Sequence, residues 1–343
     1  DYLYRAGRTF NGGEFGIIAQ DITGKQLWTY PVHLSDGSRD YPYFFSDIME
    51  KNGILHVIYA DHEKESLKHV VIESFSGKVL IDETLASYSK ETGWETFFLE
   101  MVGHRVIWED NIAYIEGQDN KGVYLTKWLM NADLTLQLIW VRYFSEKPFM
   151  EDMFPSGSGD VGLTNIDSST NFCILLPIWQ PKKDDKYTFD LHCVDKQTGK
   201  STWIIQNQTI DYDLHFYSIN SSILMIREIH NPKQEPNRIF ITALNPSSGK
   251  TIWDVTLDEP PFDKETMSQS YTTICTQSTY YLFDEIKKEL VKINPETGQI
   301  IRKKMEFPHP ITKAIFNEVG HQLFLLVNTI NESGENTFLF QIE

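Results

Sequence analysis

The sequence is poor in cysteine and in positive charge, and it contains no long hydrophobic run. Its 343 residues include three cysteines, and 31 lysines and arginines stand against 48 aspartates and glutamates, which gives a formal net charge of −17. An acidic surface repels phosphate backbones and anionic lipid headgroups, so we expect no nucleic-acid partner. The longest apolar stretches, such as residues 173–179, are far shorter than the roughly 20 residues that a membrane-spanning helix needs. We therefore expect no membrane span.

The three cysteines are too few and too scattered for a disulfide framework or a zinc site, because both need cysteines paired at short spacing. Cys173, Cys193 and Cys275 each lie within an apolar run that is typical of a strand. A free thiol in such a run is normally buried. The sequence thus predicts three buried free thiols.

Common catalytic motifs are also missing. No H-E-x-x-H, Walker A or G-x-S-x-G sequence occurs. The segment GSGDVG, residues 157–162, matches G-x-G-x-x-G letter for letter. A dinucleotide site needs a strand before this motif and a helix after it, and the flanking residues predict neither. We interpret the segment as a loop between structural units and expect no dinucleotide cofactor.

What the sequence does contain is an internal repeat of about fifty residues. ALNPSSGKTIW, residues 243–253, aligns position by position with CVDKQTGKSTW, residues 193–203, and weaker copies begin at residues 18, 71, 128 and 292. All but the copy at residue 128 keep a glycine in the turn, and these glycines are Gly24, Gly77, Gly199, Gly249 and Gly298. Neighbouring glycines are 49 to 53 residues apart, except for one interval of 122 that contains the degenerate copy. Seven such units fill the chain.

Each unit predicts a four-stranded antiparallel meander. Residues 213–258 contain four short runs rich in β-branched and aromatic residues, with turn-forming residues between them. The glycine supplies a positive φ, and the Asp or Asn before it can bond the turn backbone. A sheet of this size has two faces to bury and two edges to protect, and radial repetition solves both problems. The same layout recurs over residues 41–86, 94–144, 161–207 and 267–306.

The pattern Ala-x-Asp/Asn-x-x-Thr/Ser-Gly-Lys-x-x-Trp resembles the repeat of quinoprotein-type β-propellers, and residues 243–253 and 193–203 keep it best. The resemblance implies an all-β fold, with residues 1–343 forming a single β-propeller of four-stranded antiparallel blades. Seven blades are favoured, eight are the alternative, and the N- and C-terminal strands are expected to close the ring. The expected units are residues 1–36, 37–88, 89–146, 147–208, 209–258, 259–306 and 307–343.

The resemblance also implies roles for particular residues. In that family a tryptophan after the turn docks between neighbouring blades, which assigns docking to Trp28, Trp203 and Trp253. The family's enzymes bind pyrroloquinoline quinone and calcium through adjacent cysteines, a tryptophan, and acidic and amide ligands. No adjacent cysteines occur here, so a quinone-dependent dehydrogenase is disfavoured and we expect no cofactor. The non-enzymatic branch of the family is favoured, with an exported or periplasmic location.

Histidines offer a second possible site. His62 and His69 flank a predicted hairpin together with Asp61 and Glu63, and such groups can bind a metal. Their spacing matches no known metal site, so we interpret them as solvated charges and expect no metal. The histidines within or beside predicted strands are expected to be structural, and these are His33, His104, His192, His215 and His321.

The strongest candidate for a binding site is the set of loops that join one blade to the next. In a propeller these loops emerge on one face around the central channel, and most of them here combine an aromatic residue with a carboxylate. That combination suits a polar ring or a cationic group. The alternative is that the aromatics plug the channel mouth and the acids belong to a generally acidic surface. The candidate residues are Asp40, Tyr41, Tyr43, Trp94, Glu95, Asp152, Tyr212, Asp213, Phe262 and His309.

Two functional hypotheses follow. The favoured one is a non-catalytic scaffold, monomeric by default, that holds a protein segment or a small polar ligand on this face. The second is an enzyme acting on a polar substrate such as a saccharide, with carboxylates at the channel mouth as acid and base.

Overall fold

The computed structural model contains only strands and turns in the residues that it describes. These residues are 2–8, 15–32, 48–61, 66–87, 106–119, 122–144, 164–168, 171–183, 186–210, 213–219, 222–229, 238–258, 271–276, 279–307, 311–319, 322–331 and 334–342. Within them no helix is long and apolar enough to span a membrane. The chain forms two compact units, residues 1–165 with 174–209 and residues 166–173 with 210–343.

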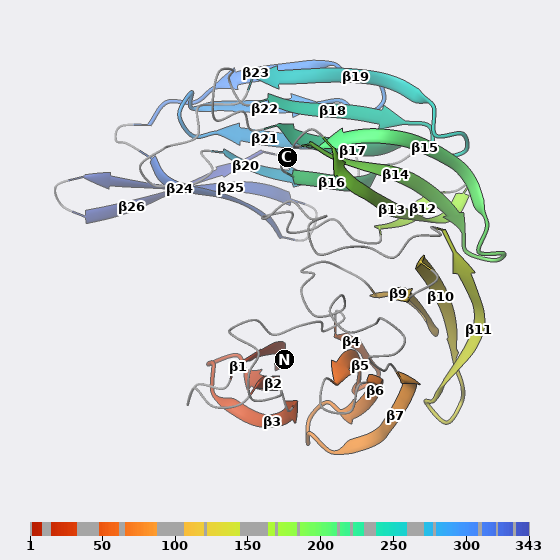
Figure 1. Cartoon of the computed structure of the whole chain (residues 1–343). Helices are drawn as coiled ribbons and strands as arrows, with labels where there is room; N and C mark the ends of the chain where they lie inside the picture. Colours follow the sequence, from red (N-terminus) through yellow and green to blue (C-terminus); the bar gives the residue numbers. More distant parts are fainter. Residues whose placement is uncertain are drawn as a thin grey trace. The chain divides into compact units, whose positions relative to one another are not determined.

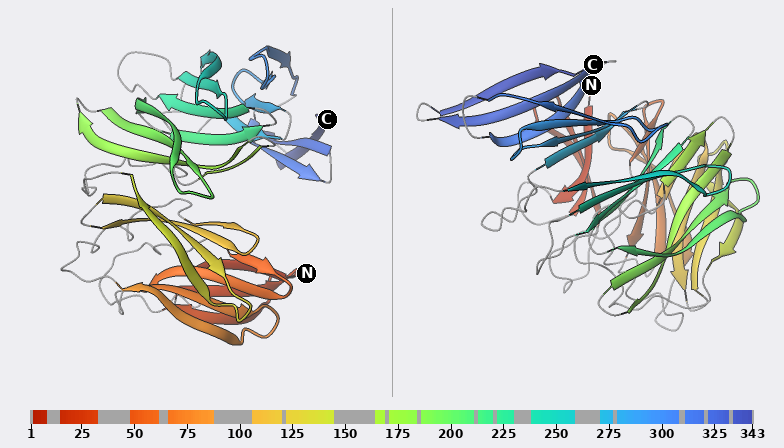
Figure 2. Two further views of the ribbon diagram at one scale, coloured as in Figure 1. Left: turned by 90° about the vertical axis from the view of Figure 1, so that its right-hand side faces the viewer. Right: turned by 90° about the horizontal axis from the view of Figure 1, so that it is seen from above.

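The first unit holds four antiparallel sheets, apart from a short piece of β12 and β13 that belongs to the second (Figures 1 and 2). The sheet orders are β1-β2-β3, β4-β5-β6-β7, β11-β10-β9-β8 and β12-β13-β14-β15. The strands are β1 (Tyr2–Arg8), β2 (Phe15–Asp21), β3 (Gln26–Val32), β4 (Met49–Lys51), β5 (Ile54–Asp61), β6 (Ser66–Glu73), β7 (Val79–Ser87), β8 (Val106–Glu109), β9 (Ile112–Asp119), β10 (Gly122–Met130), β11 (Leu136–Tyr143), β12 (Thr164–Ser168), β13 (Asn171–Lys183), β14 (Lys186–Asp195) and β15 (Ser201–Ile210).

The second unit repeats the same plan. Its sheet orders are β16-β17-β18-β19, β20-β21-β22-β23 and β24-β25-β26. The strands are β16 (Asp213–Ile219), β17 (Ser222–Ile229), β18 (Arg238–Leu244), β19 (Thr251–Asp258), β20 (Tyr271–Cys275), β21 (Tyr280–Asp284), β22 (Glu289–Ile293), β23 (Ile300–Lys304), β24 (Ile311–Val319), β25 (Gln322–Asn331) and β26 (Gly334–Gln341). The prediction of an all-β chain built from four-stranded antiparallel meanders is confirmed.

The two three-stranded sheets lack different strands. The turn glycine Gly24 lies between β2 and β3, as Gly77 lies between β6 and β7, so β1–β3 correspond to the second, third and fourth strands of a full sheet. Residues 311–343 contain no copy of the turn motif, which elsewhere joins the third and fourth strands, so the sheet β24–β26 corresponds to the first three strands.

Inner strands are buried on both faces, whereas a fourth strand such as β23 is largely exposed. Seven of the eight residues of β6 are buried, and so are all five of β21, while β23 at the edge of its sheet is largely exposed. A strand buried on both faces requires a sheet that is covered on both sides. The core accordingly lies between sheets, and one apolar cluster joins Ile17 of β2 to Leu55 and Val70 of the next sheet.

The repeated turn has the predicted geometry. The five turn glycines all have φ between 66° and 83°, the left-handed region that favours glycine. In the turn after β14, the Asp195 side chain accepts the Thr198 N–H at 2.6 Å, and its carbonyl accepts the Gly199 N–H at 2.8 Å. The copy without glycine keeps the conformation, because Leu134 takes a φ of 70° in the equivalent turn.

The turn glycine also receives a tryptophan from the preceding sheet. The indole N–H of Trp28 in β3 donates to the Ser74 carbonyl at 2.9 Å, and a Cβ added to Gly77 would lie 2.8 Å from the Trp28 ring. Trp253 in β19 does the same, because it donates to the Pro295 carbonyl at 3.0 Å and its ring lies over Gly298. A glycine is therefore needed at these turns both for its φ and for the space that the neighbouring indole occupies.

A third tryptophan docks in this way from a different position. Trp140 in β11 lies on Gly199 of the next sheet, where an added Cβ would be 3.1 Å from its ring. It comes two residues later in its strand than Trp28 does, because the β-bulge in the β10–β11 pair is also displaced, to Lys127 and Trp128. The sequence pattern did not assign docking to Trp140. Trp203, which it did assign, is buried.

The expectation of three free thiols is wrong. Cys193 is disulfide-bonded, whereas Cys275 is free, and burial raises the pKa of the Cys275 thiol to about 12. Cys193 lies in β14, whose inner residues are fully buried. A cysteine in an apolar strand is normally a free thiol, so the sequence around Cys193 did not indicate the disulfide.

Alanine substitutions at two turn glycines separate backbone strain from the indole contact. Gly24 and Gly77 both have positive φ, but an added Cβ meets nothing within 4 Å at Gly24 and overlaps Trp28 at Gly77. We expect Gly24→Ala to lower the free energy of unfolding by about 1 kcal/mol through strain alone. Gly77→Ala should cost about 2–4 kcal/mol, because overpacking adds to the strain. Urea denaturation followed by circular dichroism measures both, and equal losses would contradict docking at Gly77.

Candidate functional site

The meander topology places the long connections of the first unit at one end of its sheets. In a four-stranded meander, the chain enters the first strand, turns between the second and third, and leaves the fourth at the same end. The opposite end carries only the hairpins between first and second and between third and fourth strands, such as the turn at Gly77. The segments 33–48, 88–105 and 145–163, which join consecutive sheets, therefore start and finish at the first end, called here the loop end.

The segments at the loop end are acidic and aromatic. Together they contain ten carboxylates and four Lys or Arg side chains, and each carries at least two aromatic residues. Loops of this length on a rigid framework are where proteins commonly carry binding residues. The composition is that expected of a site for a cationic or polar group.

The candidate binding residues of the sequence analysis lie outside the described residues, with one exception. The exception is Asp213, whose backbone begins β16. The other nine are Asp40, Tyr41, Tyr43, Trp94, Glu95, Asp152, Tyr212, Phe262 and His309. The GSGDVG segment at residues 157–162 also lies outside. The assignment of these residues to a site stays a prediction, supported in the first unit by the strand ends that flank them.

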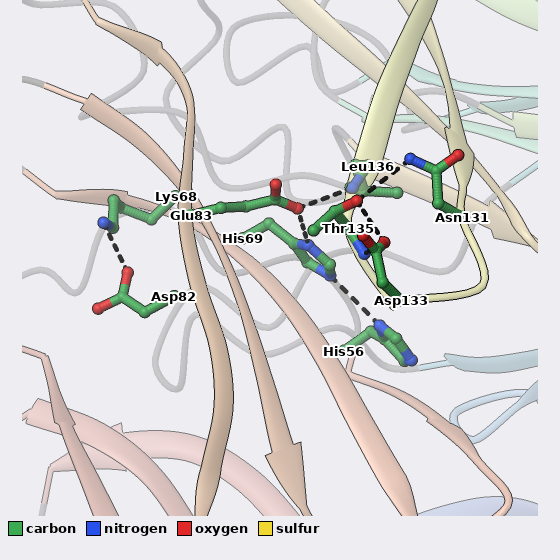
Figure 3. Close-up of polar contacts among 9 residues, drawn as sticks. All are labelled: His56, Lys68, His69, Asp82, Glu83, Asn131, Asp133, Thr135 and Leu136. Atoms are coloured by element: carbon green, nitrogen blue, oxygen red, sulfur yellow. Dashed lines mark hydrogen bonds and ion pairs between the residues drawn. The ribbon is translucent and has the colours of Figure 1, made fainter.

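The described residues hold one buried chain of titratable side chains, which lies between the sheets β4–β7 and β8–β11 (Figure 3). His56 of β5 and His69 of β6 are 2% and 0% exposed. His56 Nδ1 lies 3.2 Å from His69 Nε2, and His69 Nδ1 lies 2.7 Å from Glu83 Oε1 of β7. The same carboxylate oxygen accepts the Leu136 backbone N–H from the neighbouring sheet at 2.8 Å.

Antiparallel register brings the three side chains to one face. His69 pairs with Ile58 on β5 and with Glu83 on β7, and His56 is two residues from Ile58, so the side chains of His56, His69 and Glu83 point the same way. Trp108 of β8 packs against both imidazole rings, with centroids 5.8 and 6.0 Å away. The polar chain thus lies within an otherwise apolar interface.

Hydrogen-bond chemistry fixes the protons of this chain. An ionised carboxylate can only accept, so the His69 Nδ1 carries hydrogen and donates to Glu83. In the neutral imidazole, His69 Nε2 then accepts from His56 Nδ1–H. The pKa of His56 is lowered to about 4, mainly by burial and to a smaller extent by the charges of His69 and Lys51. Burial also lowers the pKa of His69, against the opposing effect of Glu83.

The interpretation of His69 as a solvated hairpin charge is wrong. His69 lies in the middle of β6 and is fully buried, while His62 lies outside the described residues. In the described part of the chain no three His, Cys, Asp or Glu side chains form a metal-binding group. No short sequence motif indicated His56 or Glu83. A hairpin centred between residues 63 and 64 would have placed His56 and His69 on the same face, and that signal was present in the sequence.

Two histidines expected to be structural lie in strands. His192 of β14 bonds Ser201 Oγ through Nδ1 at 2.9 Å, and burial lowers its pKa. The His215 ring of β16 stacks on Tyr217. The positions His33, His104 and His321 lie outside the described residues.

The architecture defines the class of the protein as all-β, built from β-propeller-like four-stranded sheets. No protein-family model and no curated protein matches the chain. Among solved structures, it is similar to a protein from Lactobacillus plantarum, with 9% identity and a TM-score of 0.37 over 84% of this chain and 81% of that one. It is also similar to the periplasmic gluconolactonase PpgL of Pseudomonas aeruginosa, with 12% identity and a TM-score of 0.42 over 100% and 95% of the two chains.

Replacing the carboxylate of Glu83 tests the buried chain. In Glu83→Gln the amide can still accept one N–H, but it cannot accept from both His69 and Leu136 with the strength of a charged group. We expect the free energy of unfolding at pH 7 to fall by about 1–3 kcal/mol. Glu318→Gln on the exposed surface of β24 is the matched control and should change it by less than about 0.5 kcal/mol. Equal effects of the two variants in urea denaturation would show that Glu83 holds nothing together.

Proposed function

We propose that the chain is a single β-propeller that acts as a non-catalytic binding scaffold and holds a cationic or polar group at the loop end. One observation carries the proposal: the described strands of the first unit deliver its acidic, aromatic connecting segments to the same end of their sheets, and short turns close the other end. Sheets that are buried on both faces supply the rigid framework that such loops need.

The ring that we propose has seven blades. The described residues form seven sheets, one for each proposed blade, and an open arrangement of these sheets would leave edges uncovered. Covering such edges removes open hydrogen-bonding groups, which is the reason that closed folds are favoured. The disulfide at Cys193 supports placement of the protein in an oxidising, extracytoplasmic compartment.

The proposed ligand is a Lys- or Arg-bearing protein segment. Carboxylates such as Asp40, Glu95 and Asp152 attract its charge, and aromatic faces such as Tyr43 and Trp94 hold it by cation–π contact. The net charge of −17 steers such a segment toward the surface before it makes contact. Binding should therefore weaken as salt screens these charges.

Calorimetric titration with a Lys- and Arg-rich peptide tests this function. We expect Asp40→Asn/Glu95→Gln/Asp152→Asn to weaken binding at least about tenfold, because three attractive charges are lost. The matched control removes three exposed acids that lie elsewhere, in Asp254→Asn/Glu296→Gln/Glu318→Gln. The control should bind within about threefold of the unmodified protein, since its smaller loss comes only from net charge. Equal weakening in both variants would contradict a site at the loop end.

An activity assay distinguishes the enzyme hypothesis from the scaffold proposal. A neutral disaccharide and a sugar lactone are incubated with the protein, and their hydrolysis is followed. The scaffold proposal predicts no turnover. Turnover that the three loop-end substitutions abolish and the control retains would overturn it in favour of acid–base catalysis by paired carboxylates.

A further inference from the structure

The joint between the sheets β4–β7 and β8–β11 is built differently from the joints that contain a docked tryptophan. At the strand position that Trp28 occupies in β3, β7 carries Ile81. The turn that would receive an indole carries Leu134 in place of glycine. The indole and the glycine that makes room for it are thus both missing from this joint.

A carboxylate takes over the polar link at this joint. Trp28 and Trp253 each donate a hydrogen bond to a carbonyl in the neighbouring turn. Here the direction is reversed, because Glu83 accepts the N–H of Leu136 at the end of the neighbouring turn. Its position is fixed by His69, which is in turn bonded to His56 (Figure 3). An indole does not titrate, whereas His56, His69 and Glu83 all carry titratable groups.

We propose that the His56–His69–Glu83 chain makes this joint a pH-sensitive latch, closed at neutral pH and opened by acid. At neutral pH each contact pairs a donor with an acceptor: His56 Nδ1–H donates to His69 Nε2, and His69 Nδ1–H donates to Glu83. One added proton is accommodated on His69, which then forms an ion pair with Glu83. Binding of a second proton is strongly unfavourable, because two imidazolium rings would then carry like charges with their nearest nitrogens 3.2 Å apart in a buried site.

On the described elements that surround the His56–His69–Glu83 chain, no other group offsets the repulsion between the two imidazolium rings. Lys51, near the end of β4, adds a further positive charge. The charged groups that come from the surrounding elements each have a partner of their own: Lys51 with Asn111, Glu109 of β8 with Lys196, and Asp133 of the turn before β11 with Thr135. Glu83 is thus the carboxylate that the two imidazoles share, and it balances one positive charge.

The sign of the effect follows from linkage. The pKa values of both histidines are lower in the closed joint than the ordinary value of 6.5, so the open joint binds more protons between pH 6.5 and about 4. The joint therefore loses stability as pH falls through this window and regains it as pH rises. For a pKa of about 4 in the closed joint, His56 alone raises the opening constant by up to roughly 30-fold between pH 7.5 and pH 5.

Hydrogen exchange of the intact protein, followed by mass spectrometry at pH 7.5 and at pH 5, measures this opening directly. The reporter is the peptide containing the Leu136 amide, and the internal reference is the peptide covering β2 and β3, whose joint contains Trp28. After correction for intrinsic exchange rates, we expect opening at Leu136 to increase by at least about tenfold at pH 5. The reference should change by less than about threefold. A flat profile at Leu136, or an equal change in the reference, would overturn the proposal.

Two asparagine variants identify the residue responsible. In His56→Asn the amide nitrogen replaces Nδ1 as a donor to His69 but cannot take a proton, so most of the pH dependence at Leu136 should disappear. His192→Asn is the matched control, because His192 is also buried and bonded through Nδ1, and it should leave the Leu136 profile unchanged. An unchanged profile in His56→Asn would contradict the latch.

Glu83→Gln keeps the proposal testable where His56→Asn does not fold. Protonated His69 then loses its counter-ion, so opening at Leu136 should rise more steeply below pH 6.5 than in the unmodified protein. The same pH profile in both proteins would overturn the latch.

Discussion

The interaction on which the structure depends is the contact of one sheet with the turn of the next. Inner strands such as β6 and β21 are buried on both faces, so a sheet without neighbours would expose a large apolar surface. The recurring contact places an indole on a left-handed glycine, where the absence of a Cβ lets the ring approach and its N–H reach a carbonyl. Glycine at the turn therefore specifies the hairpin and leaves the space in which the tryptophan of the preceding sheet docks.

The joint at Glu83 shows what happens when this pair is lost. Without the indole, the same interface holds a carboxylate and two imidazoles inside an apolar cluster. Burying polar groups is tolerated only when each has a partner. Their hydrogen bonds hold the joint at neutral pH, and their ability to take protons makes the same joint lose stability in acid.

Much of the fold follows from local sequence signals. The turn glycines, the Asp or Asn before them and the alternating strands are all short-range features, and the described sheets follow the predicted four-run layout. The prediction failed where the outcome depends on partners far apart in sequence. Trp140 docks through a displaced β-bulge, Cys193 is disulfide-bonded, and His69 is covered by Trp108 of the neighbouring sheet. None of these is encoded in a short motif.

The candidate binding site stays a prediction. Its residues come from long connecting segments, whose conformations are not fixed by strand periodicity or by turn chemistry. What the described strands do fix is where each connecting segment of the first unit begins and ends.

The most direct test of the account is a double-mutant cycle between Trp28 and Gly77. If the indole occupies the space that the glycine leaves open, Gly77→Ala should cost about 1–3 kcal/mol less in a Trp28→Ala background than in the unmodified protein, because only the backbone strain remains. Additive losses, within about 0.5 kcal/mol, would mean that the two residues act independently. The docking of Trp28 on the turn at Gly77 would then not be what holds these two sheets together.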